Sequence, residues 1–199
     1  MPIDCTSNLT ANITFDCANA PIAGIEQNVI LINKEDIDYT NVTLDTTNPT
    51  LVSNLQLKPG TTGYLLTGVK QSNGKAWELV KKESAPDKFK HTFSGVIFNP
   101  GAANKLQASK LAMGAKYVVV IEQVWKGEGS ADAFEVLGLK SGLELSTMTN
   151  NSKENDNMIM FELASVDGYE EVTMPQTLLD GDYAATKTAF TNLFAQAAG

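Results

Sequence analysis

The chain has 199 residues, of which 15 are basic and 23 acidic, so its formal net charge at pH 7 is −8. Hydrophobic residues make up 43% of the chain, which excludes an intrinsically disordered protein and suffices for one domain with a sizeable core. All basic residues are lysine, and because arginine supplies the planar fork that reads phosphates and base edges, a protein that recognises nucleic-acid sequence is excluded.

The first 22 residues differ in character from the rest of the chain. They are polar and rich in Asn and Thr, and they lack a periodic apolar face, so we expect an N-terminal arm over residues 1–22. The arm begins without the positive charge and apolar stretch of a secretory signal. Residues 23–199 are expected to form a single β-rich domain that ends in a helix. No run of 18 apolar residues occurs, so no contact with a membrane is expected.

Most of the domain has the pattern of short strands separated by turns. Branched apolar residues and alternation predict strands over residues 25–33, 39–44, 51–57, 64–70, 75–81, 89–98, 116–125, 133–140, 143–148 and 158–165. Asn73-Gly74 stands between two of these segments and predicts a type I′ hairpin that pairs them, because both central residues of that turn need positive φ.

Two segments carry the start signals of a helix. Asn99 as N-cap, followed by Pro100, predicts a helix over about 99–113. Asp182 as N-cap predicts a second helix over about 182–197, which has an apolar stripe. The strands do not alternate with helices. We therefore predict a mainly β fold, an antiparallel β-sandwich or barrel with two helices and extended loops.

The chain offers few residues for catalysis or metal binding. His91 is the one histidine, has no hydrolase or metalloprotease motif near it, and is expected to be a solvated strand residue. Cys5 and Cys17 lack the short spacing of a structural zinc site and are expected to be free thiols in a reducing compartment. We therefore predict a protein that is not an enzyme and has no catalytic residue, metal or cofactor.

Four consecutive strand segments each carry one glutamate in their interior, at Glu122, Glu135, Glu144 and Glu162. Period-2 alternation places all but Glu135 opposite the more apolar face of their strands. Glu135 falls in phase with Leu137 unless a bulge shifts the register. Two interpretations stay open: an ordinary solvated sheet face, or a negative surface that repels a polyanion.

Two segments of the C-terminal half carry a resemblance to a known family. Ala133–Met148 (AFEVLGLKSGLELSTM) precedes a polar loop and a strand, and Met174–Lys187 (MPQTLLDGDYAATK) opens the terminal helix. This layout resembles the tail tube and related ring-forming virion proteins of tailed bacteriophages, in particular phages of Bacteroidota. The resemblance covers most of the chain in its general style and includes no catalytic motif.

The resemblance implies a non-enzymatic structural subunit that assembles into stacked hexameric rings around a channel for genomic DNA. Its partners would be further copies of itself and other phage tail proteins, with DNA only a non-specific passing cargo. The protein would be located in the phage tail, after assembly in the host cytoplasm. The channel-facing acids would be Glu122, Glu144, Glu162 and Glu135, because a negative wall does not retain DNA.

Residues 39–62 are rich in Thr and Asn and are broken by Pro49 and Pro59, which predicts an extended loop that stands off the domain. Loops of this kind bridge stacked rings in the family that the chain resembles. We therefore expect Leu51 and Leu55 to be inter-ring contacts, buried only on stacking. The arm over residues 1–22 is likewise expected to be held by neighbouring subunits, since it could not repay its own ordering entropy.

Two alternative functions remain open from the sequence. One is a tail-terminator, collar or decoration protein of the virion. The other is a carbohydrate-binding β-sandwich, in which Trp77 and Trp125 would be exposed and would stack on sugars.

Overall fold

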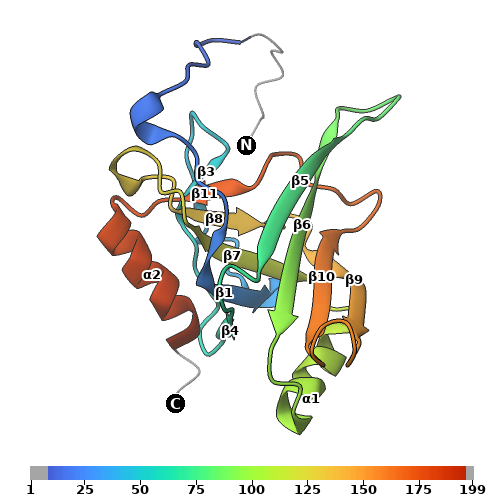
Figure 1. Cartoon of the computed structure of the whole chain (residues 1–199). Coiled ribbons are helices and arrows are strands. Elements are labelled where there is room, and N and C mark those ends of the chain that lie inside the picture. Colours follow the sequence, from blue (N-terminus) through green and yellow to red (C-terminus); the bar gives the residue numbers. More distant parts are fainter. Residues whose placement is uncertain (1–8, 196–199) are drawn as a thin grey trace.

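The computed structural model describes residues 9–195, which form eleven β-strands and two α-helices (Figure 1). The strands are β1 (Ile25–Asn33), β2 (Thr43–Leu44), β3 (Leu51–Asn54), β4 (Tyr64–Thr67), β5 (Gly74–Val80), β6 (Lys88–Ile97), β7 (Tyr117–Gln123), β8 (Phe134–Leu137), β9 (Leu143–Asn150), β10 (Ile159–Ser165) and β11 (Gln176–Leu178). The helices are α1 (Ala102–Leu111) and α2 (Tyr183–Ala195), and neither of these described helices could cross a bilayer. The prediction of a mainly β fold with two helices is confirmed.

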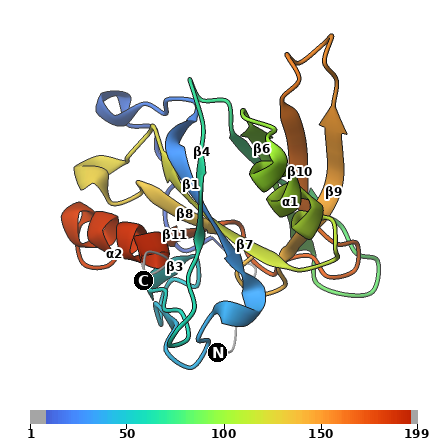
Figure 2. The same cartoon turned by 90° about the horizontal axis from the view of Figure 1, so that it is seen from below.

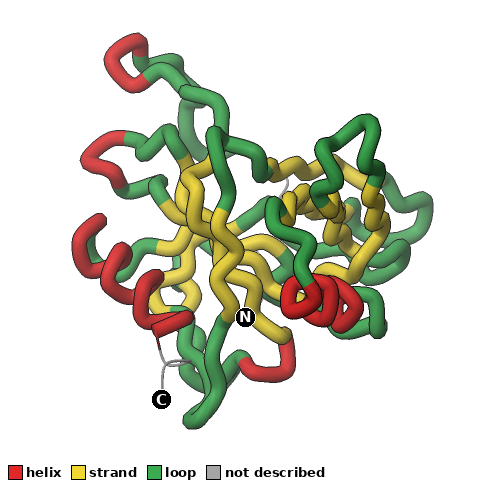
Figure 3. The backbone as a smooth tube through the Cα atoms, turned by 60° about the horizontal axis from the view of Figure 1, so that its bottom comes forward, coloured by secondary structure: helices red, strands yellow, loops and turns green. Residues whose placement is uncertain are grey.

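All described strands belong to one sheet, in the order β2-β3-β11-β8-β7-β9-β10-β6-β5, with β1 on the other edge of β7 and β4 beyond β1. The pairs are antiparallel except that of β3 with β11, which is parallel. β8 and β9 share one edge of β7, but β9 reaches β7 only at the Tyr117–Leu143 pair. Near the Tyr117–Leu143 pair the sheet turns a corner, and Gly138 and Gly142 adopt positive φ there. Beyond this corner the strands separate into two groups (Figure 3).

We call the strands β4, β1, β7, β8, β11, β3 and β2 the large half of the sheet, and β9, β10, β6 and β5 the small half. The strand β7 lies at their junction and is buried on both faces. Val119 and Ile121 belong to the core between the two halves, whereas Val118 and Val120 belong to a second core, under α2. Burial on two sides explains why the sequence of β7 is a continuous apolar run rather than an alternating one.

The ends of the helices differ in how closely they follow the predictions. α2 begins as predicted, because the Asp182 carboxylate accepts a hydrogen bond from the backbone N–H of Ala185 at 2.8 Å. The predicted end of that helix, residue 197, lies outside the described residues. α1 begins later than predicted, with Gly101 as N-cap, and the Asn99 carbonyl instead accepts a hydrogen bond from the side chain of Asn104.

The predicted Asn73-Gly74 hairpin does not form. β4 pairs with β1 and β5 pairs with β6, so the two strands that flank the turn are not partners. The positive φ values fall at Lys70 and Gln71 instead. Asn73 is buried and its side-chain oxygen accepts a hydrogen bond from the backbone N–H of Val96 at 3.1 Å. This contact with a distant segment outweighs the local turn preference.

His91 lies inside the protein, which corrects the expectation of a solvated residue. Its side chain on β6 is 2% exposed. Its Nδ1 accepts a hydrogen bond from the backbone N–H of Gly138 at 3.1 Å, and its Nε2 lies 2.9 Å from the Thr173 carbonyl oxygen. A neutral ring with its proton on Nε2 satisfies both partners. Burial lowers the pKa of His91 to about 4, against the opposing effect of the Thr173 hydrogen bond and with the help of the Lys75 charge.

We expect His91 to make the protein less stable as the pH falls from 7 to 5. The unfolded chain takes up a proton at His91 near pH 6.5, and the folded chain only near pH 4, so this contribution is complete above pH 6.5 and is lost toward pH 4. The loss between pH 7 and pH 5 should be about 2 kcal/mol, measured as the free energy of unfolding in urea. His91→Gln should remove this part of the pH dependence, and an unchanged dependence in the variant would contradict the assignment.

Candidate functional site

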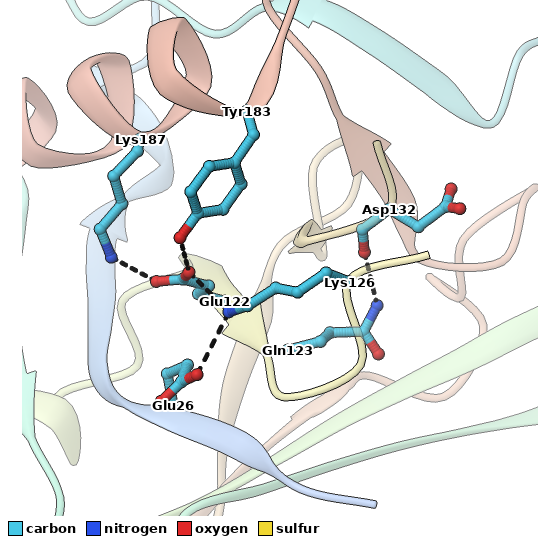
Figure 4. A network of polar contacts seen from close by, with 7 residues as sticks. All are labelled: Glu26, Glu122, Gln123, Lys126, Asp132, Tyr183 and Lys187. Atoms are coloured by element: carbon cyan, nitrogen blue, oxygen red, sulfur yellow. Dashed lines mark hydrogen bonds and ion pairs between the residues drawn. The ribbon is translucent and has the colours of Figure 1, made fainter. Parts of the chain in front are cut away.

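Glu122 is the centre of a buried ionic network between β7 and α2 (Figure 4). Its Oε1 accepts hydrogen bonds from the amino group of Lys126 at 2.6 Å and from the hydroxyl group of Tyr183 at 2.7 Å. Its Oε2 pairs with the amino group of Lys187. Lys126 also contacts the carboxylate of Glu26, on β1, at 3.2 Å. The network thus joins β7 to α2 directly and to β1 through Lys126.

Hydrogen bonds outweigh burial in deciding the charge of Glu122. Burial alone would raise the pKa of this carboxyl group, but the hydrogen bonds from Lys126, Lys187 and Tyr183 hold the pKa below its ordinary value. The hydrogen bond between Tyr183 and Glu122 raises the pKa of the Tyr183 hydroxyl group to about 12, because a phenolate would face a carboxylate. Glu122 therefore stays ionised at neutral pH, with the amino groups of Lys126 and Lys187 and the neutral phenol of Tyr183 around it.

The burial of Glu122 contradicts the expectation that it faces a water-filled channel. The alternation along β7 is as predicted, since Glu122 is two residues from Val120 and shares its face. That face is covered by α2, however, whose Tyr183 and Lys187 project onto it (Figure 4). The spacing of four residues between Tyr183 and Lys187, which places both on one side of a helix, is a sequence signal for the α2 part of this network.

Glu135 lies on the other face of the sheet. It is the cross-strand neighbour of Ile121, and the β7–β8 register has no bulge. Its carboxylate forms an ion pair with Lys75 of β5 and accepts a hydrogen bond from the Gln123 side chain at 3.1 Å. Glu135 therefore joins the two halves of the sheet, and the expectation that it faces a channel together with Glu144 and Glu162 is wrong.

Glu144 and Glu162 occupy one partly exposed face of the small half, as the alternation predicted. Glu144 pairs across strands with Ala164, which is two residues from Glu162. The Glu144 carboxylate is 3.6 Å from the amino group of Lys116, and Glu162 accepts a hydrogen bond from the Ser146 hydroxyl at 2.7 Å. Both carboxylates stay accessible enough to give this face of the small half a negative charge. Their position on a channel wall stays a prediction.

Residues 39–62 pack against the sheet and do not stand off the domain. β2 pairs with β3, and β3 adds to β11. Leu55 is 8% exposed and lies in the core under α2, so it is already buried in the subunit and its assignment as an inter-ring contact is wrong. Leu51 is half-buried beside Thr177 of β11, and its contact with another ring stays a prediction.

The described part of the arm, residues 9–22, lies on the outside of the domain before the start of β1 (Figure 1). Its one contact of note is a hydrogen bond of 3.1 Å from the indole N–H of Trp125 to the Asn19 carbonyl. Leu9, Ile13 and Phe15 are 81%, 88% and 74% exposed. The arm therefore presents apolar side chains that its own subunit does not cover. The indole N–H of Trp125 is thus already paired, and its part in sugar binding stays a prediction.

A groove of about 910 Å³ lies between β4 and α1, two elements whose positions are seen in Figure 2. Tyr64 and Leu66 of β4 form one wall, and Ile97 and Leu111, from the end of β6 and from α1, form the other. A smaller cavity of about 440 Å³ borders Glu171, whose burial raises the pKa of its carboxyl group. Within residues 9–195 no group of three His, Cys, Asp or Glu side chains is placed to hold a metal.

No protein-family model, no curated protein and no solved structure matches the chain. The ionic network around Glu122 is fully paired and holds α2 in place. The accessible features are the apolar arm, the groove beside β4, and the acidic face that carries Glu144 and Glu162.

Replacing Glu122 by Gln should destabilise the protein by about 2–3 kcal/mol, because the amino groups of Lys126 and Lys187 would lose their shared counter-ion in a partly buried site. The stabilisation by Glu122 should be present at pH 7 and be lost below pH 4.5, where the unfolded carboxyl is protonated first.

The matched control is Glu26→Gln, which removes a more exposed partner of Lys126 and should cost less than about 1 kcal/mol. Both values come from unfolding in urea at pH 7. Equal losses in the two variants would show that the buried network does not anchor α2.

Proposed function

We propose that this protein is a non-enzymatic virion structural subunit that assembles with copies of itself, as the tail tube of a tailed bacteriophage does, in stacked hexameric rings around a DNA channel. The observation that carries self-assembly is the arm, where Leu9, Ile13 and Phe15 are largely exposed and have no cover in their own subunit. Several apolar side chains concentrated on one extended segment are typical of a contact surface and not of a monomer.

The edges of the sheet add a second argument for association. β4 and β5 each pair on one side only within the described residues, and both expose apolar side chains. Trp77 and Leu79 of β5 are 46% and 48% exposed. Monomeric proteins protect such edges with charge, bulges or a covering loop, because unpaired backbone groups invite another strand. Here the edges are suited to contacts between subunits.

The charge of the chain suits a wall past which DNA moves. Its net charge is −8, and Glu144 and Glu162 share a partly exposed face that would line the channel. Carboxylates repel phosphate, so DNA makes no lasting contacts with such a face. The lack of arginine removes the side chain that would hold phosphate most strongly.

Purified wild-type protein should form rings or tubes with sixfold symmetry in negative-stain electron microscopy. Replacing Glu144 and Glu162 together by Lys should leave this assembly intact, because both side chains lie on a partly exposed face. The assembled variant should bind short duplex DNA at least about tenfold more tightly at low salt, measured by co-sedimentation.

The control variant carries Glu83→Lys and Glu128→Lys, which make the same charge change at two exposed positions outside that face. It should bind DNA much less than the Glu144 and Glu162 variant. Equal DNA binding by both variants would place Glu144 and Glu162 on an outer surface, and a wild-type protein that stays monomeric would refute the tube.

A further inference from the structure

The barrel-like sheet is open along one side. Within residues 9–195, β4 pairs only with β1, β5 only with β6 and β2 only with β3, so the sheet ends at β4 and β5 on the side of the groove and at β2 elsewhere. β4 and the last residues of β6 form opposite walls of the groove described above. The outer edge of β4 therefore keeps a row of unpaired backbone N–H and C=O groups beside this groove.

The groove reaches the core between the two halves of the sheet. Leu31, Tyr117 and Phe161 line it and belong to that core. At the rim, Tyr64 and Leu65 of β4 are 51% and 43% exposed. Apolar surface next to a core is normally covered by close packing, so the groove lacks a segment of chain that would complete the sheet.

The arm has the properties of that missing segment. Leu9, Ile13 and Phe15 are at odd positions, so an extended chain places all three on one side. Isoleucine, threonine and phenylalanine favour strands, and residues 12–15 (NITF) contain little else. An edge strand beside an apolar groove binds such a segment by backbone hydrogen bonds and by side chains that enter the groove.

The charges of the two surfaces are complementary. The residues that line the groove include a single charged side chain, Lys110 of α1. Residues 9–22 of the arm also include a single charged side chain, Asp16. A positive groove and a negative arm attract each other and disfavour the pairing of two grooves or of two arms.

The arm starts at the end of the molecule opposite the groove. It leaves from the first residue of β1, where Ile25 pairs with Gln123, whereas Leu31 and Asn33, which line the groove, lie six and eight residues further along that strand, about 20–26 Å away. The hydrogen bond from Trp125 to Asn19 keeps the arm at its own end. We propose that residues 9–16 of one copy lie in the groove of a second copy and add a strand to β4.

This inference rests on the proposed self-assembly and specifies which surfaces of two copies are in contact. Because the arm and the groove are different surfaces, the contact is head-to-tail and repeats from copy to copy, in a closed ring or an open stack. It requires that the arm of one subunit and the groove of the next both be intact, and this requirement can be tested by mixing variants.

The experiment uses two full-length variants and their masses in solution. The arm variant carries Ile13→Asp and Phe15→Asp, and the groove variant carries Tyr64→Asp, all at exposed positions. Each variant alone should be monomeric. An equimolar mixture should form a heterodimer of twice 21.4 kDa and grow no further, because one intact arm meets one intact groove. Light scattering coupled to size-exclusion chromatography measures these masses.

Matched controls carry the same charge at neighbouring positions. Thr14→Asp lies on the opposite side of the extended arm, and Met160→Asp lies on β10, 46% exposed and facing away from the groove beside Phe161. Both controls should assemble like the wild type. Lys110→Glu tests the groove without touching β4, and should weaken assembly about tenfold.

The outcomes separate the contact from the proposed function. An arm variant that assembles like the wild type, or a mixture that stays monomeric while the wild type assembles, overturns the arm–groove contact and leaves the proposed tube intact. A heterodimer from the mixture, with no sixfold rings from the wild type, supports the contact and overturns the tube. A wild-type protein that is monomeric at every concentration overturns both.

Discussion

Burial of β7 on both faces is the constraint on which the rest of the structure depends. Val118 and Val120 must be covered on one side and Val119 and Ile121 on the other, so a single layer of strands cannot complete the fold. The small half of the sheet covers one face, and α2 with the β2–β3 segment covers the other. The corner at Gly138 and Gly142 allows one continuous sheet to serve as its own second layer.

The ionic network around Glu122 is a consequence of that cover. Once α2 lies on the sheet, Glu122 loses water, and an unpaired carboxylate there would cost several kcal/mol. Lys126, Lys187 and Tyr183 supply the partners, so the network stabilises one position of α2 over others. Its role is therefore structural. Of the four strand glutamates, only Glu144 and Glu162 lie on a partly exposed face, because α2 covers Glu122 and Glu135 pairs with Lys75 of β5.

The small half of the sheet covers its face of the large half only incompletely. This difference between the two faces links the fold to the proposed function. The small half reaches across the core but does not close against β4, which leaves the groove on one side of the molecule. The arm leaves an excess of apolar side chains at the opposite end. A subunit with an open groove beside the edge strand β4 and an uncovered apolar arm at the opposite end is suited to a chain of identical copies, in which each copy covers surface of the next.

Local pattern in the sequence determined the type of most elements. The branched run of β7, the Asp182 N-cap of α2 and the alternation that separates Glu135 from Glu144 and Glu162 all depend on neighbours within a few residues. Such signals act through backbone geometry and survive in almost any surroundings. The mainly β fold with two helices, and the faces of these acids, could therefore be predicted.

Contacts between distant segments decided the rest. Asn73 bonds to Val96 instead of closing a hairpin, Leu55 enters the core under α2, and Glu122 and His91 are buried by segments at least 45 residues away in sequence. Whether a side chain meets water depends on what covers its face, and alternation along one strand does not contain that information. The sequence by itself determined which face each residue occupies. Only the tertiary structure decided which faces were covered, because burial is a property of the packed layers and not of the single strand.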